Sequence, residues 1–445
     1  MGQEQSNPSF GIELEFLVAL KVDSTALVVP ERFQSLPGAP IWVEGLTQQR
    51  EFEVAAQRIV QTIVRAVGSH LGLRVKPDIE SNHLSVYQNW TVGNDVSVDV
   101  DQETLDENGM QSIHWQSIEI RSPAMHDCES SWDEVFRVVE AISEEYWILT
   151  PRSAGMHVHY GNGADYIPLS KLRRIAAFLY AADPILVSLY PEHRRANIFC
   201  FSNRLYSVVA HGTTARTVTQ LLGFPELEES LESPRGPVRK IPPSSDRRRN
   251  TQFKRAFTRG SLAGYTFHIE YFRETEMDYE GRGLNNSTPY EISFGVDEIL
   301  KTLNCSTTAE LMSVVQADFD RPAYSFRSYR AHRYKQQPLP DTQLLKTIEF
   351  RQMPATMDAR EVVAHAKIVV GMCKWASTTE LATLWRVAFD CAEAERRRDW
   401  YDVFDLLVDL NLEDEARVLQ QAVAKWRGDP IPDDVKEDDD SDLDH

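Results

Sequence analysis

Several features of common protein classes are missing or scarce in this chain of 445 residues. It has only 5 cysteines, an odd number without a CxxC pair, so neither a disulfide framework nor a cysteine-rich zinc site is expected. No apolar run approaches the roughly 20 residues that a membrane-spanning helix needs. Two glutamates interrupt the apolar stretch at 10–22, so we expect no signal peptide, no membrane anchor and a cytoplasmic protein. Neither GxxxxGK[ST] nor GxGxxG occurs, which excludes the two familiar glycine-rich phosphate-binding loops.

Basic residues are outnumbered: 47 Lys and Arg stand against 67 Asp and Glu, a net charge of −20. A nucleic-acid-binding protein should present a basic face, so this function is not expected. One basic segment, at 235–259, is interpreted as a loop, with contact to substrate phosphates as the alternative. The acidic residues 428–445 are expected to form a disordered tail, for which a regulatory or partner-binding role is the alternative.

The remaining composition, with 42% hydrophobic and 10% aromatic residues, is sufficient for a large core. Alternating apolar residues predict strands at 10–22, 84–92, 112–121, 154–161, 265–273 and 346–353. Helical periodicity predicts helices at 47–71, 131–148, 169–189, 359–375, 379–397 and 412–426, the second opened by a capping box of Ser131 and Glu134. Because strands and helices do not alternate regularly, we expect an α+β fold on an antiparallel sheet. One catalytic domain at 8–427 is expected, with a Pro-, Ser- and Arg-rich loop at about 228–250.

Carboxylates alternate with apolar residues in two of these strands. In FGIELEFLVAL, at 10–20, Glu13 and Glu15 share one strand face, and in HWQSIEIRSP, at 114–123, Glu119 and Arg121 do the same. Two carboxylates one pleat apart repel each other, so they require water or a cation. The first segment is therefore either a half-buried strand with a wetted face or a source of metal ligands.

Two further strands place polar residues on one face. In SAGMHVHYGNG, at 153–163, His157 and His159 lie on the same face between glycines, and they suit either a metal, phosphate oxygens or a purely structural role. In KTIEFRQMPATMD, at 346–358, Glu349 and Arg351 alternate with apolar residues. They either form a surface ion pair with each other or have separate roles, in which the carboxylate binds metal and the guanidinium binds phosphate.

Taken together, these segments supply the donors that hard cations use when they bridge a polyphosphate. FGIELEF, IEIRSP, SAGMHVHYGN and TIEFRQMPATMD resemble, in order and spacing, the amidoligase family of ATP-dependent carboxylate–amine ligases. FGIELEF, SAGMHVH and TIEFR are also similar to the FGxExEF, SGMHxH and ExR strands of glutamine synthetase. The resemblance extends over about 10–375. It implies a glutamine synthetase-like, curved antiparallel sheet with helices packed on its convex side.

The resemblance also implies metal ligands. Glu13, His157 and Glu349 would hold the ion over the transferred phosphate. Glu15 and Glu119 would hold a second ion on the acyl-acceptor side.

Other positions would contact the reacting molecules. Arg351 would stabilise the transferred phosphoryl group or the acyl phosphate, and His159 would face the substrate or nucleotide. The segment PEHRRANIFCFSNR, at 191–204, is similar to an Arg–Asn segment of the family. It makes Arg195, Asn197 and Arg204 candidate contacts to substrate or ATP.

The function implied is amide-bond formation between a small-molecule carboxylate and an amine, the latter being ammonia, an amino acid or a larger molecule. It would require ATP and two or more Mg²⁺ ions, for which Mn²⁺ could substitute, and would proceed through an acyl phosphate. Three alternatives remain open: a kinase of the same fold that does not ligate, a cupin-type metal oxygenase using the HxH pair, and an inactive binding protein. Neither nucleic acid nor a membrane is an expected partner, and the sequence leaves the oligomeric state open.

Overall fold

The computed structural model describes residues 8–21, 31–34, 37–43, 48–67, 89–99, 105, 113–195, 200–207, 253–259, 261–262, 302, 304–316, 321–329, 345–396 and 399–431. The chain forms two compact units. The first comprises 1–165, 339–345 and 352–366, and the second comprises 166–338, 346–351 and 367–445. Within the described ranges, no helix combines the length and the apolarity of a membrane span.

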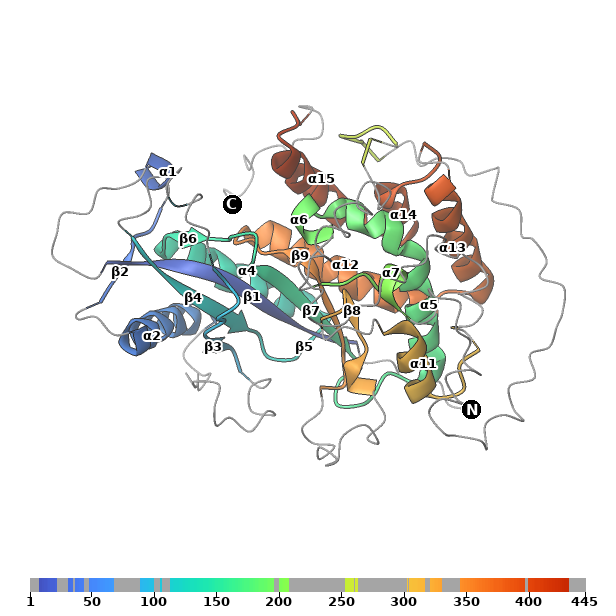
Figure 1. The fold of residues 1–445 in the computed structure, drawn as a ribbon, viewed down its shortest axis with the longest axis horizontal. Coiled ribbons are helices and arrows are strands. Elements are labelled where there is room, and N and C mark those ends of the chain that lie inside the picture. Colours follow the sequence, from blue (N-terminus) through green and yellow to red (C-terminus); the bar gives the residue numbers. More distant parts are fainter. Residues whose placement is uncertain are drawn as a thin grey trace, which may run out of the picture. The chain divides into compact units, whose positions relative to one another are not determined.

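The first unit contains a largely antiparallel sheet centred on β1 (Ser9–Lys21) (Figure 1). Strand β4 (His114–Arg121) pairs with one edge of β1, and β7 (Gly155–Gly161) pairs with the other. The order of the main strands is β3-β4-β1-β7, where β3 is Thr91–Gly93. The short strands that also pair with β1 are β2 (Ile41–Trp42), which is parallel to it, β5 (Met125–His126) and β6 (Ile148–Leu149).

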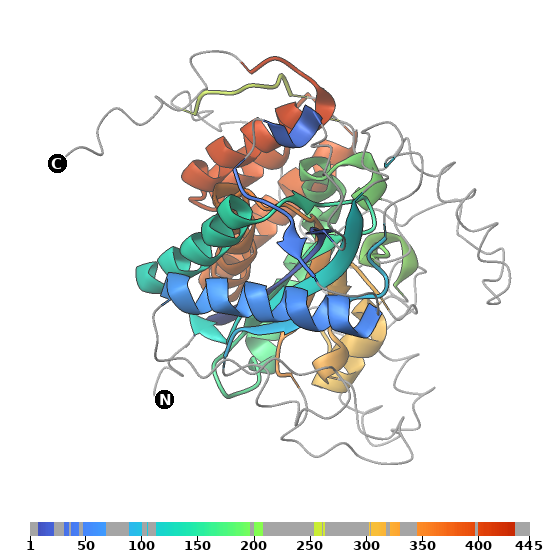
Figure 2. The same ribbon diagram turned by 90° about the vertical axis from the view of Figure 1, so that its left-hand side faces the viewer.

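Helices α2 (Gln48–Val67) and α4 (Glu129–Glu145) cover one face of this sheet, side by side, as Figure 2 shows. The short α1 (Glu31–Gln34) belongs to the same unit. Alternate β1 residues, such as Phe10, Ile12 and Leu14, are at most 2% exposed. The Phe10 ring stacks on Trp132 of α4 with a centroid distance of 4.0 Å. The other face of β1 therefore carries Glu13 and Glu15, as the period of two requires.

The second unit is mainly helical. Its helix α5 (Leu169–Leu186) continues into the 3-10 turn η2 (Val187–Leu189) and packs against α11 (Thr308–Val315) and α13 (Leu381–Arg396). The remaining elements are α6 (Glu192–Arg195), α7 (Asn203–Tyr206), β8 (Tyr324–Ser325), η6 (Arg327–Tyr329), α14 (Val403–Asp409) and α15 (Glu413–Arg427). Strand β9 (Ile348–Pro354) and helix α12 (Ala359–Thr378) run from one unit into the other. Within the second unit β8 pairs antiparallel with β9.

The α+β class and the antiparallel sheet are confirmed. The long strands and helices lie within a few residues of their predicted bounds, whereas β2, β5, β6, β8, α11 and α14 were not predicted. The predicted strands at 84–92 and 265–273 lie wholly or mainly outside the described residues, as do the loop at about 228–250 and the acidic tail from 432 onward.

The predicted capping box of Ser131 and Glu134 is wrong. Helix α4 begins at Glu129 with Cys128 at its N-cap, so Ser131 lies inside the helix. Glu134 instead accepts a hydrogen bond from Nε1 of buried Trp90 at 2.8 Å. A buried indole N–H without an acceptor would be costly, and this requirement outweighs the local capping pattern.

The basic segment predicted at 235–259 is described at 253–259, where its arginines form ion pairs within the second unit. Arg255 pairs with Asp402 and Asp405, and Arg259 pairs with Asp405. Phe257 stacks on Phe404 in α14. These arginines thus anchor the segment to the start of α14.

Candidate functional site

The strand register brings the predicted acidic and histidine residues of the first unit onto one sheet face. Glu13 of β1 lies directly opposite Arg121 of β4 and His157 of β7, while Glu15 lies opposite Glu119. Directly opposed residues in antiparallel strands project to the same side of a sheet. Three adjacent strands therefore present their polar side chains together, on the face opposite the helices α2 and α4. His159 shares that face, because it lies two residues beyond His157 on β7.

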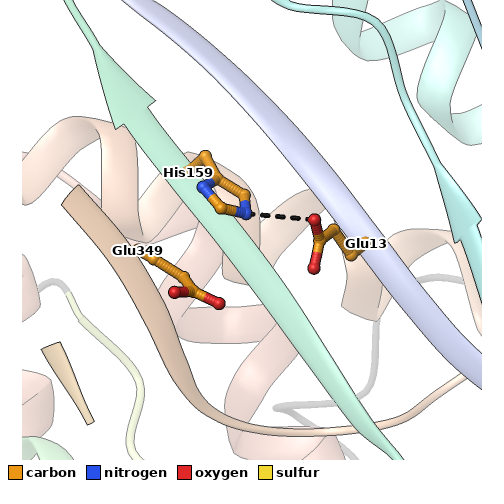
Figure 3. Close-up of side chains that lie close together, drawn as sticks. All are labelled: Glu13, His159 and Glu349. Carbon is orange, nitrogen blue, oxygen red and sulfur yellow. Dashed lines mark ion pairs between the residues drawn. The ribbon is translucent and has the colours of Figure 1, made fainter. Parts of the chain in front are cut away.

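Glu13 is at the centre of this group. Its Oε2 lies 3.1 Å from His157 Nδ1, and its Oε1 lies 3.3 Å from His159 Nε2 and 3.6 Å from Arg121 Nε. Figure 3 shows the ion pair with His159 as a dashed line between β1 and β7. Burial alone would raise the pKa of Glu13, but the charges and hydrogen bonds of His159 and His157 hold that pKa well below its ordinary value. Glu13 is thus an ionised, nearly buried carboxylate facing two imidazoles.

A second cluster consists of carboxyl groups alone. Glu15, Asp95 and Glu119 each offer an oxygen atom that lies within 4.8 Å of the other two. The backbone N–H of Gly155 donates to Glu15 Oε2 at 2.7 Å, and Arg121 pairs with Glu119. His157 connects the two clusters, because its Nε2 is 3.6 Å from Glu15 Oε1 while its Nδ1 faces Glu13.

The pKa values of two carboxyl groups in the second cluster are shifted in opposite directions. Burial, followed by repulsion from Glu13, raises the pKa of Glu119 well above its ordinary value, although Arg121 acts in the opposite direction. Burial also raises the pKa of Asp95, but hydrogen bonds from the side chain and backbone of Ser97 bring it below its ordinary value. Like charges this close cannot all remain ionised without a proton or a cation among them.

The donor chemistry of this face fits divalent cations. Carboxylate oxygens alone, as in the second cluster, suit hard ions such as Mg²⁺ and Mn²⁺. The mixture of one carboxylate and two imidazoles around Glu13 also accepts Mn²⁺, Zn²⁺ or Fe²⁺.

Asp95 is a member of this group that the sequence reasoning missed. It follows β3 in the loop segment 94–97, where the residue pattern gives no strand face to share with Glu15 or Glu119. Its position next to them depends on β3 pairing with β4, in which Gly93 lies opposite Glu119. A three-residue strand is too short to be recognised by alternation.

The other predicted pair, Glu349 and Arg351, lies on β9 in the residues assigned to the second unit. Their side chains share a strand face and form an ion pair with each other. The carbonyl of Arg351 accepts a hydrogen bond from Nη2 of Arg194 at 2.6 Å, and Arg194 is only 1% exposed. Figure 3 includes Glu349, drawn on β9.

The candidate contacts at 191–204 have different placements. Arg195 is buried, and its Nε donates to the carbonyl of Tyr190 at 2.7 Å. Arg204 is also buried and stacks over the ring of Tyr180, 4.4 Å from its centroid. Asn197 lies outside the described residues. The roles assigned to these three residues stay predictions.

Comparisons with known proteins bear on the first part of the chain. Residues 6–220 match a family model described as "Putative amidoligase enzyme". The matched residues include the strands β1, β4 and β7 and every residue of the two clusters, whereas β9 lies beyond them. A search of curated proteins found no match. The resemblance to the amidoligase family is therefore confirmed over residues 6–220, the part of the chain that builds the acidic face.

Proposed function

We propose that this protein is an ATP-dependent carboxylate–amine ligase that forms an amide bond through an acyl phosphate. The family match supports an enzyme of the ligase class. The single observation that carries the finer proposal is the convergence of Glu13, Glu15, Glu119 and His157 on one sheet face. A carboxylate is a poor acyl donor because oxide would have to leave. Phosphoryl transfer from ATP makes phosphate the leaving group, and this transfer requires mainly positioning and charge neutralisation.

In this proposal Glu13 and His157 bind one ion, and Glu15 and Glu119 bind another. Such ions, when bound, supply positive charge against the phosphate oxygens of ATP and of the acyl phosphate. Glu15 is held in place by the Gly155 N–H, and Glu119 by Arg121. His159, whose Nε2 faces Glu13 Oε1, would lie against the substrate or the nucleotide. Oxygen ligands from a rigid sheet provide a site that does not need to reorganise during the reaction.

We further propose that Glu349 and Arg351 serve the same reaction. Glu349 would add a carboxylate ligand, and the guanidinium of Arg351 would bind two oxygens of the transferred phosphoryl group. Support comes from the alternation of β9, which puts both side chains on one strand face, and from the sequence resemblance. A curved, glutamine synthetase-like sheet with helices on its convex side is part of this proposal.

The test is a search for the condensation product. Metal-free protein is incubated with ATP, Mg²⁺ and pools of carboxylic acids and amines, and mass spectrometry monitors ADP and any species with the mass of acid plus amine minus water. We expect Glu349→Gln and Arg351→Lys to lower product formation by about 10²–10³-fold, the usual loss for one electrostatic partner of a transition state. The exposed Glu140→Gln and Arg417→Lys are the matched controls. ADP and a phosphorylated substrate without amide would instead indicate a kinase.

A second candidate has a specific observation in its favour. Glu13 with His157 and His159 forms a group of one carboxylate and two histidines, which is the ligand set of many non-haem iron oxygenases. Metal analysis of the purified protein separates the two functions. Bound iron together with oxygen consumption that does not depend on ATP would contradict the ligase proposal.

A further inference from the structure

The segment between β3 and the buried Val98 is fixed on several sides. Asn94 Oδ1 accepts hydrogen bonds from Ser117 Oγ at 2.5 Å and from Gln116 Nε2 at 3.2 Å, both on β4. The N–H of Val98 donates to the carbonyl of Asp95 at 3.2 Å, and Val98 is 5% exposed in the hydrophobic core. This short segment, residues 94–97, is therefore tied to β4 at one end and to the core at the other.

Within this turn, Ser97 binds one particular atom of Asp95. Both its backbone N–H, at 2.7 Å, and its hydroxyl, at 2.6 Å, donate to Asp95 Oδ1. Two donors on one oxygen fix the rotation of the carboxyl group. The Asp95 carboxyl therefore stays turned toward Glu15 and Glu119, within the 4.8 Å that joins the three residues.

We propose that the turn at 94–97 positions Asp95 as a ligand of the ion held by Glu15 and Glu119, and that Ser97 is its positioning residue. The inference rests on the proposed function, because it concerns the same acidic face. It adds a ligand and a supporting residue that lie outside the strands carrying the recognisable motifs. Hydrogen-bond partners that orient a ligand commonly affect metal affinity about 10–100-fold.

The experiment measures Mn²⁺ binding to the full chain in the absence of ATP, by the electron paramagnetic resonance signal of the free ion. We expect Asp95→Asn and Ser97→Ala to weaken binding of one ion by about 10–100-fold. Ser97→Thr keeps the hydroxyl and should bind almost as the unmodified protein does. Val96→Ala is the matched control, since this neighbouring side chain is 88% exposed.

The outcomes separate positioning from a merely structural role. Whatever the melting temperatures of the metal-free proteins, the rise in melting temperature caused by Mn²⁺ should shrink in Ser97→Ala and recover in Ser97→Thr. A lower melting temperature of metal-free Ser97→Ala with unchanged Mn²⁺ affinity would overturn the inference. If Asp95→Asn binds Mn²⁺ as tightly as the unmodified protein does, the inference about Asp95 is wrong. The proposed function would still stand in that case if the unmodified protein synthesises an amide. If the unmodified protein binds no Mn²⁺, both proposals fail.

Discussion

Glu119→Gln provides a test in which metal binding and stability should change in opposite directions. The substitution keeps the volume of a side chain that is 4% exposed and removes its charge. Burial and the repulsion from Glu13 raise the pKa of Glu119 well above the ordinary value of 4.5. Without metal, the ionised carboxylate is therefore unfavourable in the folded protein. A glutamine amide can still accept a hydrogen bond from Arg121.

The sign follows from proton linkage. A carboxyl group whose pKa is raised on folding contributes stability below its unfolded pKa, and this contribution disappears as pH rises through the folded pKa. Arg121 offsets part of the repulsion but does not reverse the direction of the shift. We therefore expect metal-free Glu119→Gln to be more stable than the unmodified protein at pH 7–8, and this difference to disappear as the pH falls below 4.5.

Calorimetry of chelator-treated protein between pH 4.5 and 8, with and without Mn²⁺, measures both effects. An ion at one hundred times its dissociation constant stabilises the unmodified protein by about 2.7 kcal/mol, and this gain should be largely lost in Glu119→Gln. Glu140→Gln, on the exposed side of α4, should change neither quantity. If Glu119→Gln proves less stable without metal at pH 7, or keeps the full Mn²⁺ effect, Glu119 is a structural partner of Arg121 and the assignment is wrong.

Three further predictions concern the framework. Burial lowers the pKa of His365 from 6.5 to about 3, so its neutral form is favoured on folding and stability should fall as pH drops from 6.5 towards 3; His365→Asn should flatten this dependence in urea titrations. Asp402 caps α14 and pairs with Arg255, so Asp402→Ala should cost about 0.5–2 kcal/mol in urea unfolding, whereas the exposed Asp414→Ala should cost little. Trp132→Ala, which removes the ring stacked on Phe10, should cost about 3–5 kcal/mol, and a smaller loss would show that α4 does not depend on this contact.

Long strands and helices with one buried face could be predicted from the pattern of apolar residues in the sequence. Residues 12–16 of β1 alternate between apolar and acidic side chains, so the polar face could be predicted, and the apolar residues 17–20 that follow continue the strand. By contrast, β5 and β6 have two residues each and owe their existence to pairing with β1. No local pattern of two residues can specify a strand, because the deciding interactions are backbone hydrogen bonds to a distant segment.

The same distinction explains the candidate site. Glu13, Glu15, Glu119 and His157 were predictable because each lies on a strand whose apolar residues define the opposite face. Asp95 was not, because its place is set by a turn that is attached to β4 through Asn94 and Ser117. The contact of Arg194 with β9 was also missed. It is a hydrogen bond to the carbonyl of Arg351, and because every residue has a backbone carbonyl, the sequence does not indicate which one accepts the bond.

The two faces of β1 also explain how the first unit can tolerate its concentration of carboxylates. On the helix-covered face, Phe10, Ile12, Leu14 and Phe16 are all at most 2% exposed, and fully burying each such side chain contributes about 1.5–3 kcal/mol. The repulsion on the other face is partly compensated by Arg121, His157 and His159. A strand secured from one side can therefore keep mutually repelling carboxylates close together on its other face. It follows that removing the ion should loosen the turn at 94–97 before it loosens β1, and amide hydrogen exchange of the two segments, with and without Mn²⁺, would reveal the order.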